Sequence, residues 1–168
     1  WGGAISLILA TSTPRARRLV LEDPAIGWRN ADPAERAQRR DSYVATVGLA
    51  PAAAAAQVRA NRPSGWTEAD IEGKIDAVVK ASPEAVRAVF DENPGWDLHD
   101  LMARLACPTL LVRAPIERGG IVSPEAVSLA EANPNVHVVT LPEADHNIHR
   151  GQFDRFMAEV ERFLNGAR

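Results

Sequence analysis

The chain has 168 residues, of which 46% are hydrophobic and 24% are charged, and its formal net charge is −3. This composition is typical of a globular protein and argues against disorder, and the slightly acidic charge argues against electrostatic binding of nucleic acid. The longest apolar run is well below the ~18 residues of a membrane span. A single cysteine, Cys107, excludes an intrachain disulfide. Since no signal-peptide pattern is visible either, we expect a cytoplasmic protein without nucleic-acid or membrane partners.

The first predicted element is a helix over the apolar stretch from Ala4 to Ala10, which directly follows Trp1-Gly2-Gly3. A domain seldom begins in the middle of an element without a polar lead, so we expect part of the fold to precede Trp1. Next, the short runs Arg18–Leu21 and Pro108–Val112 predict fully buried strands of a parallel sheet. A third run, Val136–Leu141, predicts another strand.

Helical patterns separate and follow these strands. The chain reads as entirely helical from about Asp32 to Ala106, with Thr67 and Ser82-Pro83 as helix starts. Ser123-Pro124 opens a further helix, and the apolar stripe between Phe153 and Leu164 predicts an amphipathic helix near the end. Strands that alternate with helices in this order indicate an α/β fold with a mostly parallel sheet and flanking helices.

The long helical insertion between two strands predicts a cap over the carboxyl edge of the sheet, where open α/β sheets bind ligands. We therefore expect three segments. Residues 1–30 and 107–168 would form the core, and residues 31–106 would form the helical cap.

His146 is the first candidate for chemistry because it follows the third predicted strand, at the ligand-binding edge of the sheet. Imidazole titrates near neutral pH, so it can accept a proton from a nucleophile and return it to a leaving group. A loop histidine that caps the last helix is the alternative. Trp1-Gly2 fits the last two residues of a G-x-S-x-G turn, in which a strand, a nucleophile and a helix lie close together.

Taken together, the motifs resemble the C-terminal half of an α/β-hydrolase with a helical cap, and the resemblance covers essentially the whole chain. They are Trp1-Gly2-Gly3, Arg18–Pro24 (RLVLEDP), Cys107–Arg113 (CPTLLVR), Gly119–Glu125 (GGIVSPE), Asp145-His146 and Phe153-x-x-Phe156. No single one of these motifs is highly specific, but their order and spacing are.

The resemblance implies a nucleophile, usually Ser, immediately before Trp1, together with His146 as general base and the backbone N–H of Trp1 in the oxyanion hole. It also implies that the missing N-terminal half of the same fold is a partner of these residues. We expect no cofactor. We expect no metal either, because the pair His146 and His149 lacks an accompanying cluster of ligands.

The acid that orients His146 departs from the family pattern, since Pro115 stands where the family usually has an Asp. Some members take the acid from the end of the preceding strand, where Glu22 and Asp23 stand. Strand register favours Asp23, and the alternatives are Glu117, whose long side chain lies nearby in sequence, and Glu22.

The implied activity is that of a serine esterase or lactonase with a Ser-His-acid triad and a small apolar ester or lactone as substrate. Trp1, Trp28 and Trp66 are candidate substrate contacts, although packing between cap helices is an equal reading for the last two. If the nucleophile is Asp, the enzyme would be a haloalkane dehalogenase or epoxide hydrolase. A non-catalytic fragment or binding module with the same fold is a further alternative.

Overall fold

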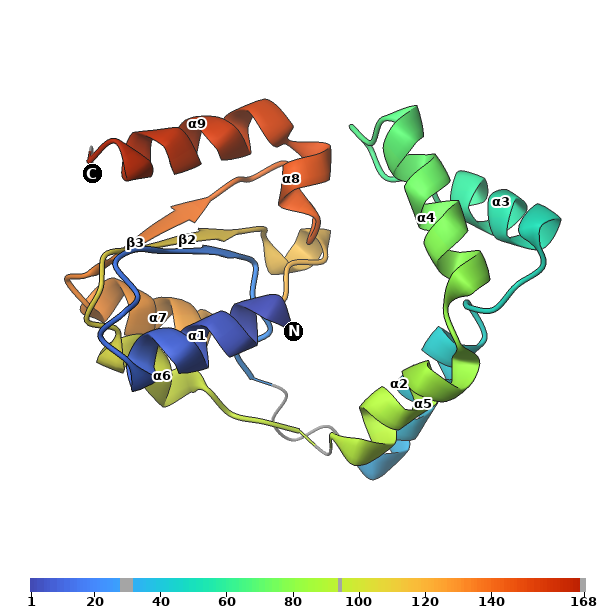
Figure 1. The fold of residues 1–168 in the computed structure, drawn as a ribbon, viewed down its shortest axis with the longest axis horizontal. Helices are drawn as coiled ribbons and strands as arrows, with labels where there is room; N and C mark the ends of the chain where they lie inside the picture. Colours follow the sequence, from blue (N-terminus) through green and yellow to red (C-terminus); the bar gives the residue numbers. More distant parts are fainter. Residues whose placement is uncertain (28–31, 94, 167–168) are drawn as a thin grey trace. The chain divides into compact units, whose positions relative to one another are not determined.

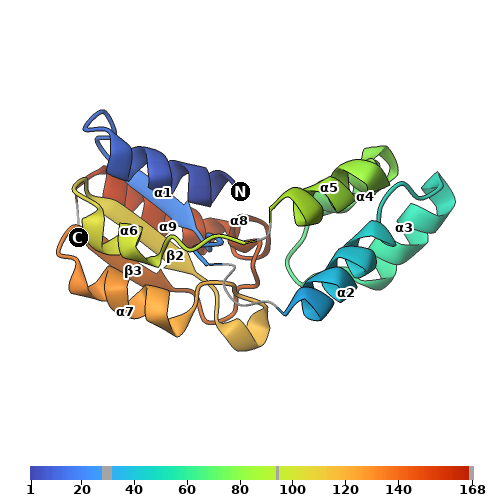
Figure 2. The same ribbon diagram turned by 90° about the horizontal axis from the view of Figure 1, so that it is seen from below.

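The computed structural model of the chain describes residues 1–27, 32–93 and 95–166. It divides into two compact units, one formed by Trp1–Trp28 with Asp97–Arg168 and the other by Arg29–Trp96. We call the first the sheet unit and the second the helical unit (Figures 1 and 2).

In its described residues the sheet unit contains three parallel strands, β1 (Leu19–Glu22), β2 (Thr109–Arg113) and β3 (Val136–Thr140), in the order β1-β2-β3. These are the three predicted strands, and their parallel pairing is confirmed. β2 is buried along its length up to Arg113, as predicted, but β1 is not fully buried. Within the described residues β1 pairs with a strand on one side only, and Leu21 is its one buried residue.

Helices cover both faces of this sheet. In Figures 1 and 2, α1, α6 and α7 lie against one face and α9 lies against the other. The helices of the sheet unit are α1 (Gly2–Ser12), α6 (His99–Arg104), α7 (Pro124–Ala132), α8 (Ile148–Gly151) and α9 (Phe153–Leu164). The arrangement is a three-layer α/β/α sandwich, which buries the central strand on both sides.

Side-chain alternation along β2 builds the two halves of the core. Leu111 packs into the cluster beneath α1, α6 and α7, whereas Leu110 and Val112 pack against α9. On α9, the middle of the predicted apolar stripe packs on the sheet, but its two ends do not, because Phe153 is 58% and Leu164 49% exposed. The start of α7 matches the prediction, and the Ser123 hydroxyl caps the helix by accepting from Ala126 N.

The helical unit is built from four helices around a small core of its own. They are α2 (Pro33–Val44), α3 (Pro51–Ala60), α4 (Glu68–Lys80) and α5 (Pro83–Glu92). The core gathers Trp66, Ile71 and Val78 with residues of α3. Thr67 and Asp70 form a capping box at the start of α4, which confirms the predicted helix start.

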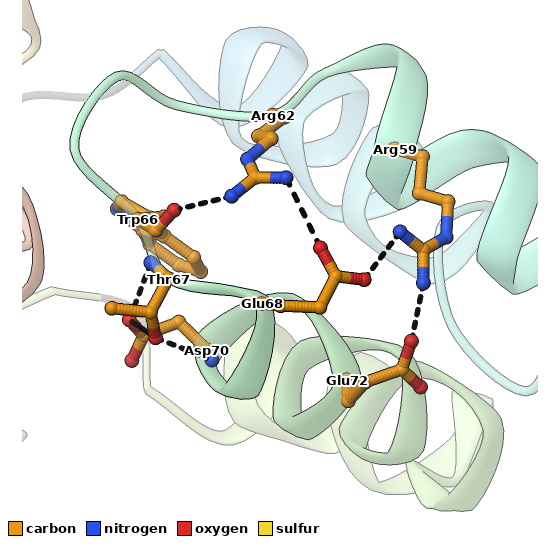
Figure 3. Close-up of polar contacts among 7 residues, drawn as sticks. All are labelled: Arg59, Arg62, Trp66, Thr67, Glu68, Asp70 and Glu72. Atoms are coloured by element: carbon orange, nitrogen blue, oxygen red, sulfur yellow. Dashed lines mark hydrogen bonds and ion pairs between the residues drawn. The ribbon is translucent and has the colours of Figure 1, made fainter.

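An exposed ion-pair network joins α3 to α4 in this unit (Figure 3). Arg59 pairs with Glu68 at 2.5 Å and also with Glu72, and Arg62 pairs with Glu68 at 3.1 Å. Arg62 also donates to the carbonyl of Trp66 at 2.6 Å. Exposed ion pairs contribute little individually, so the apolar core around Trp66 provides most of the stability of this unit.

The division between the units falls before α6, whereas the predicted helical segment extends to residue 106. α6 lies in the sheet unit because Met102, together with the following Leu105, packs into the core beneath the sheet. That the helical unit caps the sheet stays a prediction. In the described ranges, no helix has both the length and the apolar character needed to cross a membrane.

The chain segments that lead into and out of the helical unit pair with each other in the sheet unit. Gly27 forms an isolated antiparallel bridge with Asp97, and Leu98 N donates to Ile26 O at 2.9 Å. The buried ring of His99 lies against Gly27 so closely that a Cβ there would be 2.2 Å from the ring carbon Cε1.

His99 cannot easily move away from Gly27, because both of its ring nitrogens are held. Nδ1 is 2.6 Å from Asp97 Oδ1, and Nε2 is 3.0 Å from Ser123 Oγ. Through these two contacts, His99 links the segments around Gly27 and Asp97 to the start of α7.

We therefore predict that Gly27→Ala lowers the free energy of unfolding of the sheet unit by about 1–3 kcal/mol, the usual effect of overpacking a filled site. The matched control is Gly73→Ala in α4, where an added Cβ meets nothing within 4 Å. That substitution is expected to stabilise its helix by about 0.5–1 kcal/mol. Denaturant unfolding measures both, and equal effects of the two substitutions would contradict the prediction.

Candidate active site

His146 lies in the loop between β3 and α8, at the carboxyl edge of the sheet. Two buried residues of this loop, Leu141 and Ala144, anchor it to the core, and Leu141 N donates to Arg113 O at 3.0 Å. Asp145 Oδ1 accepts from Asn147 N at 2.8 Å, which forms a local turn around His146. The buried Ile148 then begins α8. The His146 side chain stays 48% exposed on this fixed loop.

Asp23 follows the last residue of β1 and is fully buried. Its N–H donates to Val112 O at 2.8 Å, so the ladder between β1 and β2 continues to this position. Its φ is +36°, a left-handed conformation that is strained for a residue with a Cβ and that Asp tolerates better than most. Strained backbone of this kind is concentrated at functional sites.

The Asp23 carboxylate meets the imidazole of His146, with Oδ2 2.8 Å from Nδ1. Oδ2 also accepts from Ile121 N at 3.0 Å, and Oδ1 accepts a longer bond from Ala114 N at 3.4 Å. A buried carboxylate needs such donors, since burial of an uncompensated charge is very unfavourable. The bonds fix both the ring orientation and the tautomer of His146, with the proton on Nδ1.

The loop after β2 provides these backbone donors because it contains two glycines. A Cβ at Gly120 would lie 2.2 Å from Ala114 O, and Gly119 has a φ of +91°. The loop can therefore fold back so that Ala114 N and Ile121 N reach the same carboxylate. Pro115, which stands in the place of the usual family acid, lies within this loop. The loop thus supports the acid through its amides instead of supplying it.

The hydrogen bond that the ring of His146 donates to Asp23 raises the pKa of His146 above its usual value of about 6.5, against the opposing effect of partial burial. The negative charges of Asp23, Glu22 and Asp145 act in the same direction. In the described part of the chain, no residue is hydrogen bonded to Nε2 of His146. This nitrogen can therefore accept a proton from a group within hydrogen-bond distance of it.

The other two candidate acids lie elsewhere. Glu22 accepts from the ring Nδ1 of His149 at 2.7 Å and from its backbone N at 2.9 Å. Glu117 is exposed in the short 3-10 helix Ile116–Arg118. Of the three acids, the structure brings only Asp23 into contact with His146. The described ranges contain no group of three or more His, Cys, Asp or Glu side chains arranged to hold a metal ion.

The tryptophans are placed differently from one another. Trp1 is 55% exposed and precedes α1, whose N-terminal end lies at the carboxyl edge of the sheet (Figure 1). Trp66 is 6% exposed in the core of the helical unit and lines a cavity of about 210 Å³ there. Trp28 lies outside the described residues.

The start of α1 lies next to the candidate acid. A Cβ at Gly3 would be 2.6 Å from the Cβ of Pro24, the residue after Asp23. Gly3 and the buried Ala4 are small enough to let this helix pack closely on the segment after β1.

Sequence reasoning missed two parts of this site. The backbone donors of the loop after β2 were not foreseen, although the pair Gly119-Gly120 signals a loop that folds back on itself. His149 was considered only as a metal ligand beside His146, and its partner Glu22 only as an acid for His146. In both cases the sequence shows which residues are present, but it does not show which of them contact each other in the folded chain.

No protein-family model matches the chain, and no curated protein matches it. Solved structures do match. An E-2-(acetamidomethylene)succinate hydrolase matches 98% of this chain with a TM-score of 0.73 and 18% sequence identity. The enol-lactonase from Burkholderia xenovorans LB400 matches 98% with a TM-score of 0.67 and 22% identity. A bromoperoxidase from Bacillus anthracis matches 98% with a TM-score of 0.70 and 18% identity.

These neighbours have the α/β-hydrolase fold, and the present chain has this fold as well, as its sequence predicts. The chain spans 64%, 62% and 64% of the three solved structures, less than two thirds of each. Sequence identities at this level establish the fold alone, so the activity rests on the geometry around His146.

We predict that Asp23→Asn lowers the pKa of His146, because the amide weakens the hydrogen bond to the ring and also removes the charge that stabilises the imidazolium. Asp145→Asn serves as the control, since Asp145 acts on His146 through its charge without a hydrogen bond, and it should cause a smaller decrease. A proton NMR titration of the imidazole resonances measures both. Equal decreases in the two variants would show that the Asp23 hydrogen bond is not the main cause.

Proposed function

We propose that the chain is the C-terminal part of a hydrolase that cleaves a carboxylic ester or lactone through a Ser-His-Asp triad. The observation that carries this proposal is the hydrogen bond between His146 and the buried, amide-supported Asp23 at the carboxyl edge of the sheet. In the proposed triad the nucleophilic Ser immediately precedes Trp1, His146 is the general base and Asp23 orients it.

In the proposed mechanism, Nε2 of His146 takes the proton of the serine hydroxyl as the oxygen attacks the substrate carbonyl. The tetrahedral intermediate collapses when the imidazolium returns this proton to the leaving alcohol, which leaves an acyl-enzyme. Water, deprotonated in turn by His146, attacks the acyl group and releases the carboxylic acid and the serine. Asp23 stays ionised and stabilises the imidazolium in both steps.

The oxyanion of each intermediate is stabilised by the N–H of Trp1, which follows the nucleophile in this proposal. The positive end of the α1 dipole lies at the same edge of the sheet and favours the same negative charge (Figure 1). The contact between Gly3 and Pro24 supports this placement, because it brings the start of α1 next to the residue after Asp23.

The substrate class proposed is a small apolar ester or lactone. One of the structural neighbours is an enol-lactonase, so the fold accommodates the hydrolysis of a lactone. Trp1 is the proposed contact closest to the reacting carbonyl. Trp66 packs in the core of the helical unit, and its part in substrate binding stays a prediction.

The proposed partner of these residues is the upstream part of the same fold. α1 is apolar, yet Ile5, Ile8 and Leu9 are 60%, 45% and 59% exposed on it. β1, in addition, is only partly buried and pairs with a strand on one side only within the described residues. Exposed apolar side chains and an open strand edge are features that a globular domain normally covers. We propose that strands and helices preceding Trp1 cover them.

The test is an assay of the polypeptide extended upstream of Trp1, with p-nitrophenyl esters of several chain lengths and a set of lactones. We predict turnover by the unmodified protein and a loss of at least about a thousandfold in kcat/KM for His146→Ala. The matched control is His137→Ala, which removes an exposed histidine of β3 and should leave turnover unchanged. No turnover of any substrate, or full activity of His146→Ala, would refute the hydrolase proposal and favour a binding module.

The nucleophile itself is tested by mass spectrometry after reaction with a fluorophosphonate. Covalent labelling of the residue before Trp1 is expected for Ser. An Asp at this position, with no labelling but with turnover of haloalkanes or epoxides, would instead support the dehalogenase or epoxide hydrolase alternative, which forms an alkyl-enzyme ester.

The raised pKa of His146 predicts how activity depends on pH. Because the base must be neutral, kcat/KM should increase with pH and level off above the raised pKa, so its midpoint should lie above about 6.5. Whereas activity increases with pH, the stability that the Asp23–His146 pair contributes decreases with pH. Its contribution is fully present below the unfolded pKa of about 6.5 and is lost as pH increases through the raised pKa. A midpoint below 6.5 in the pH-rate profile would contradict the prediction.

A further inference from the structure

A second histidine–carboxylate pair lies directly beside the first. Glu22 and Asp23 are consecutive residues, and they bind His149 and His146, which both belong to the segment after β3. Consecutive side chains of a regular strand point to opposite faces. β1 ends at Glu22 and Asp23 takes a left-handed conformation, so both carboxylates reach the same segment.

The contact of Glu22 with His149 involves both the ring and the backbone. Its Oε1 accepts from His149 N at 2.9 Å, and the ring Nδ1 lies 2.7 Å from Oε1 and 2.9 Å from Oε2. The Glu22 side chain is only 24% exposed, so these contacts are partly shielded from water. One carboxylate thus fixes the backbone and the side chain of the same residue.

We propose that the Glu22–His149 pair is a positioning element for the proposed reaction, which holds the segment that carries His146 so that the imidazole stays on Asp23. The inference rests on the proposed function of His146 and deepens it. Glu22 is not assigned as the triad acid, and neither Glu22 nor His149 touches the substrate.

The local structure requires such an element. α8 comprises only Ile148–Gly151, and so short a helix has little stability of its own. His146 lies just before it and is half exposed, and among the described residues its ring makes one hydrogen bond, to Asp23, although the loop itself is anchored by Leu141 and Ala144. Glu22 gives the segment a second attachment on the same strand end, next to the buried anchor Ile148. The two attachments together restrict rotation of the loop about Asp23.

Glu22 also acts on His146 through its charge. Three carboxylates raise the pKa of His146 through their charges, namely Asp23, Glu22 and Asp145. Glu143 lies on the same loop and is not among them; it pairs instead with Arg155 at 3.7 Å on the surface. Glu143 is therefore a matched control for the loss of one negative charge from this region.

The experiment compares five variants of the polypeptide extended upstream of Trp1. Glu22→Ala and His149→Ala remove the pair, whereas Glu22→Gln keeps its volume and an acceptor for His149 N. His149→Asn keeps a donor at the position of Nδ1, and Glu143→Gln is the control. The readouts are kcat and KM for the best ester substrate and an NMR titration of His146, which needs no turnover.

We expect Glu22→Ala and His149→Ala to lower kcat by about tenfold with little change in KM, because a small displacement of a base strongly affects the chemical step. Glu22→Ala and Glu22→Gln should both lower the pKa of His146, and His149→Asn should retain most of the activity that His149→Ala loses. Glu143→Gln should match the unmodified protein in both readouts.

An unchanged His146 titration in both Glu22 variants, or equal losses of kcat in His149→Asn and His149→Ala, would overturn the inference. Failure of the proposed function gives a different result. In that case neither the variants nor the unmodified protein turn over a substrate, while the NMR titration still reports whether Glu22 acts on His146.

Discussion

The candidate site depends on one constraint, which is that the carboxylate of Asp23 is buried and must be fully hydrogen bonded. Three separate parts of the chain satisfy it. The end of β1 supplies the carboxylate, the loop after β2 supplies Ile121 N and Ala114 N, and the loop after β3 supplies the ring of His146. An unpaired charge in this position would be strongly unfavourable, so the need to compensate it fixes all three segments relative to one another.

The position of the acid on β1 follows from the geometry of a parallel sheet. β1 and β2 are paired in register, with Glu22 opposite Val112, so the residues that follow them reach the same edge of the sheet. A carboxylate at either strand end can therefore approach a histidine held after β3. Pro115 removes the acid from the end of β2, and Asp23 supplies it from the end of β1. What the site requires is contact with the imidazole and not a particular place in the sequence.

The fold could be predicted from the sequence because hydrophobic periodicity and helix caps are local signals. The strands, the start of α7 at Ser123 and the capping box at Thr67 all follow from neighbouring residues. The pairing of acids with histidines could not be predicted from the sequence, because it depends on how loops distant in sequence fold together. Glu22 and Asp23 are adjacent, yet they bind different histidines, and the deciding factor is a left-handed backbone at Asp23 that the sequence only hints at.

All residues that hold the His146–Asp23 pair belong to the sheet unit, including the Glu22–His149 pair and the glycine loop after β2. The helical unit has a core of its own around Trp66. Its segment leaves and re-enters the sheet unit at the bridge between Gly27 and Asp97, which His99 fastens to α7. The contacts that orient His146 in the described residues therefore come from segments that follow the three paired strands, and the pairing of these strands is what brings the segments to one edge of the sheet.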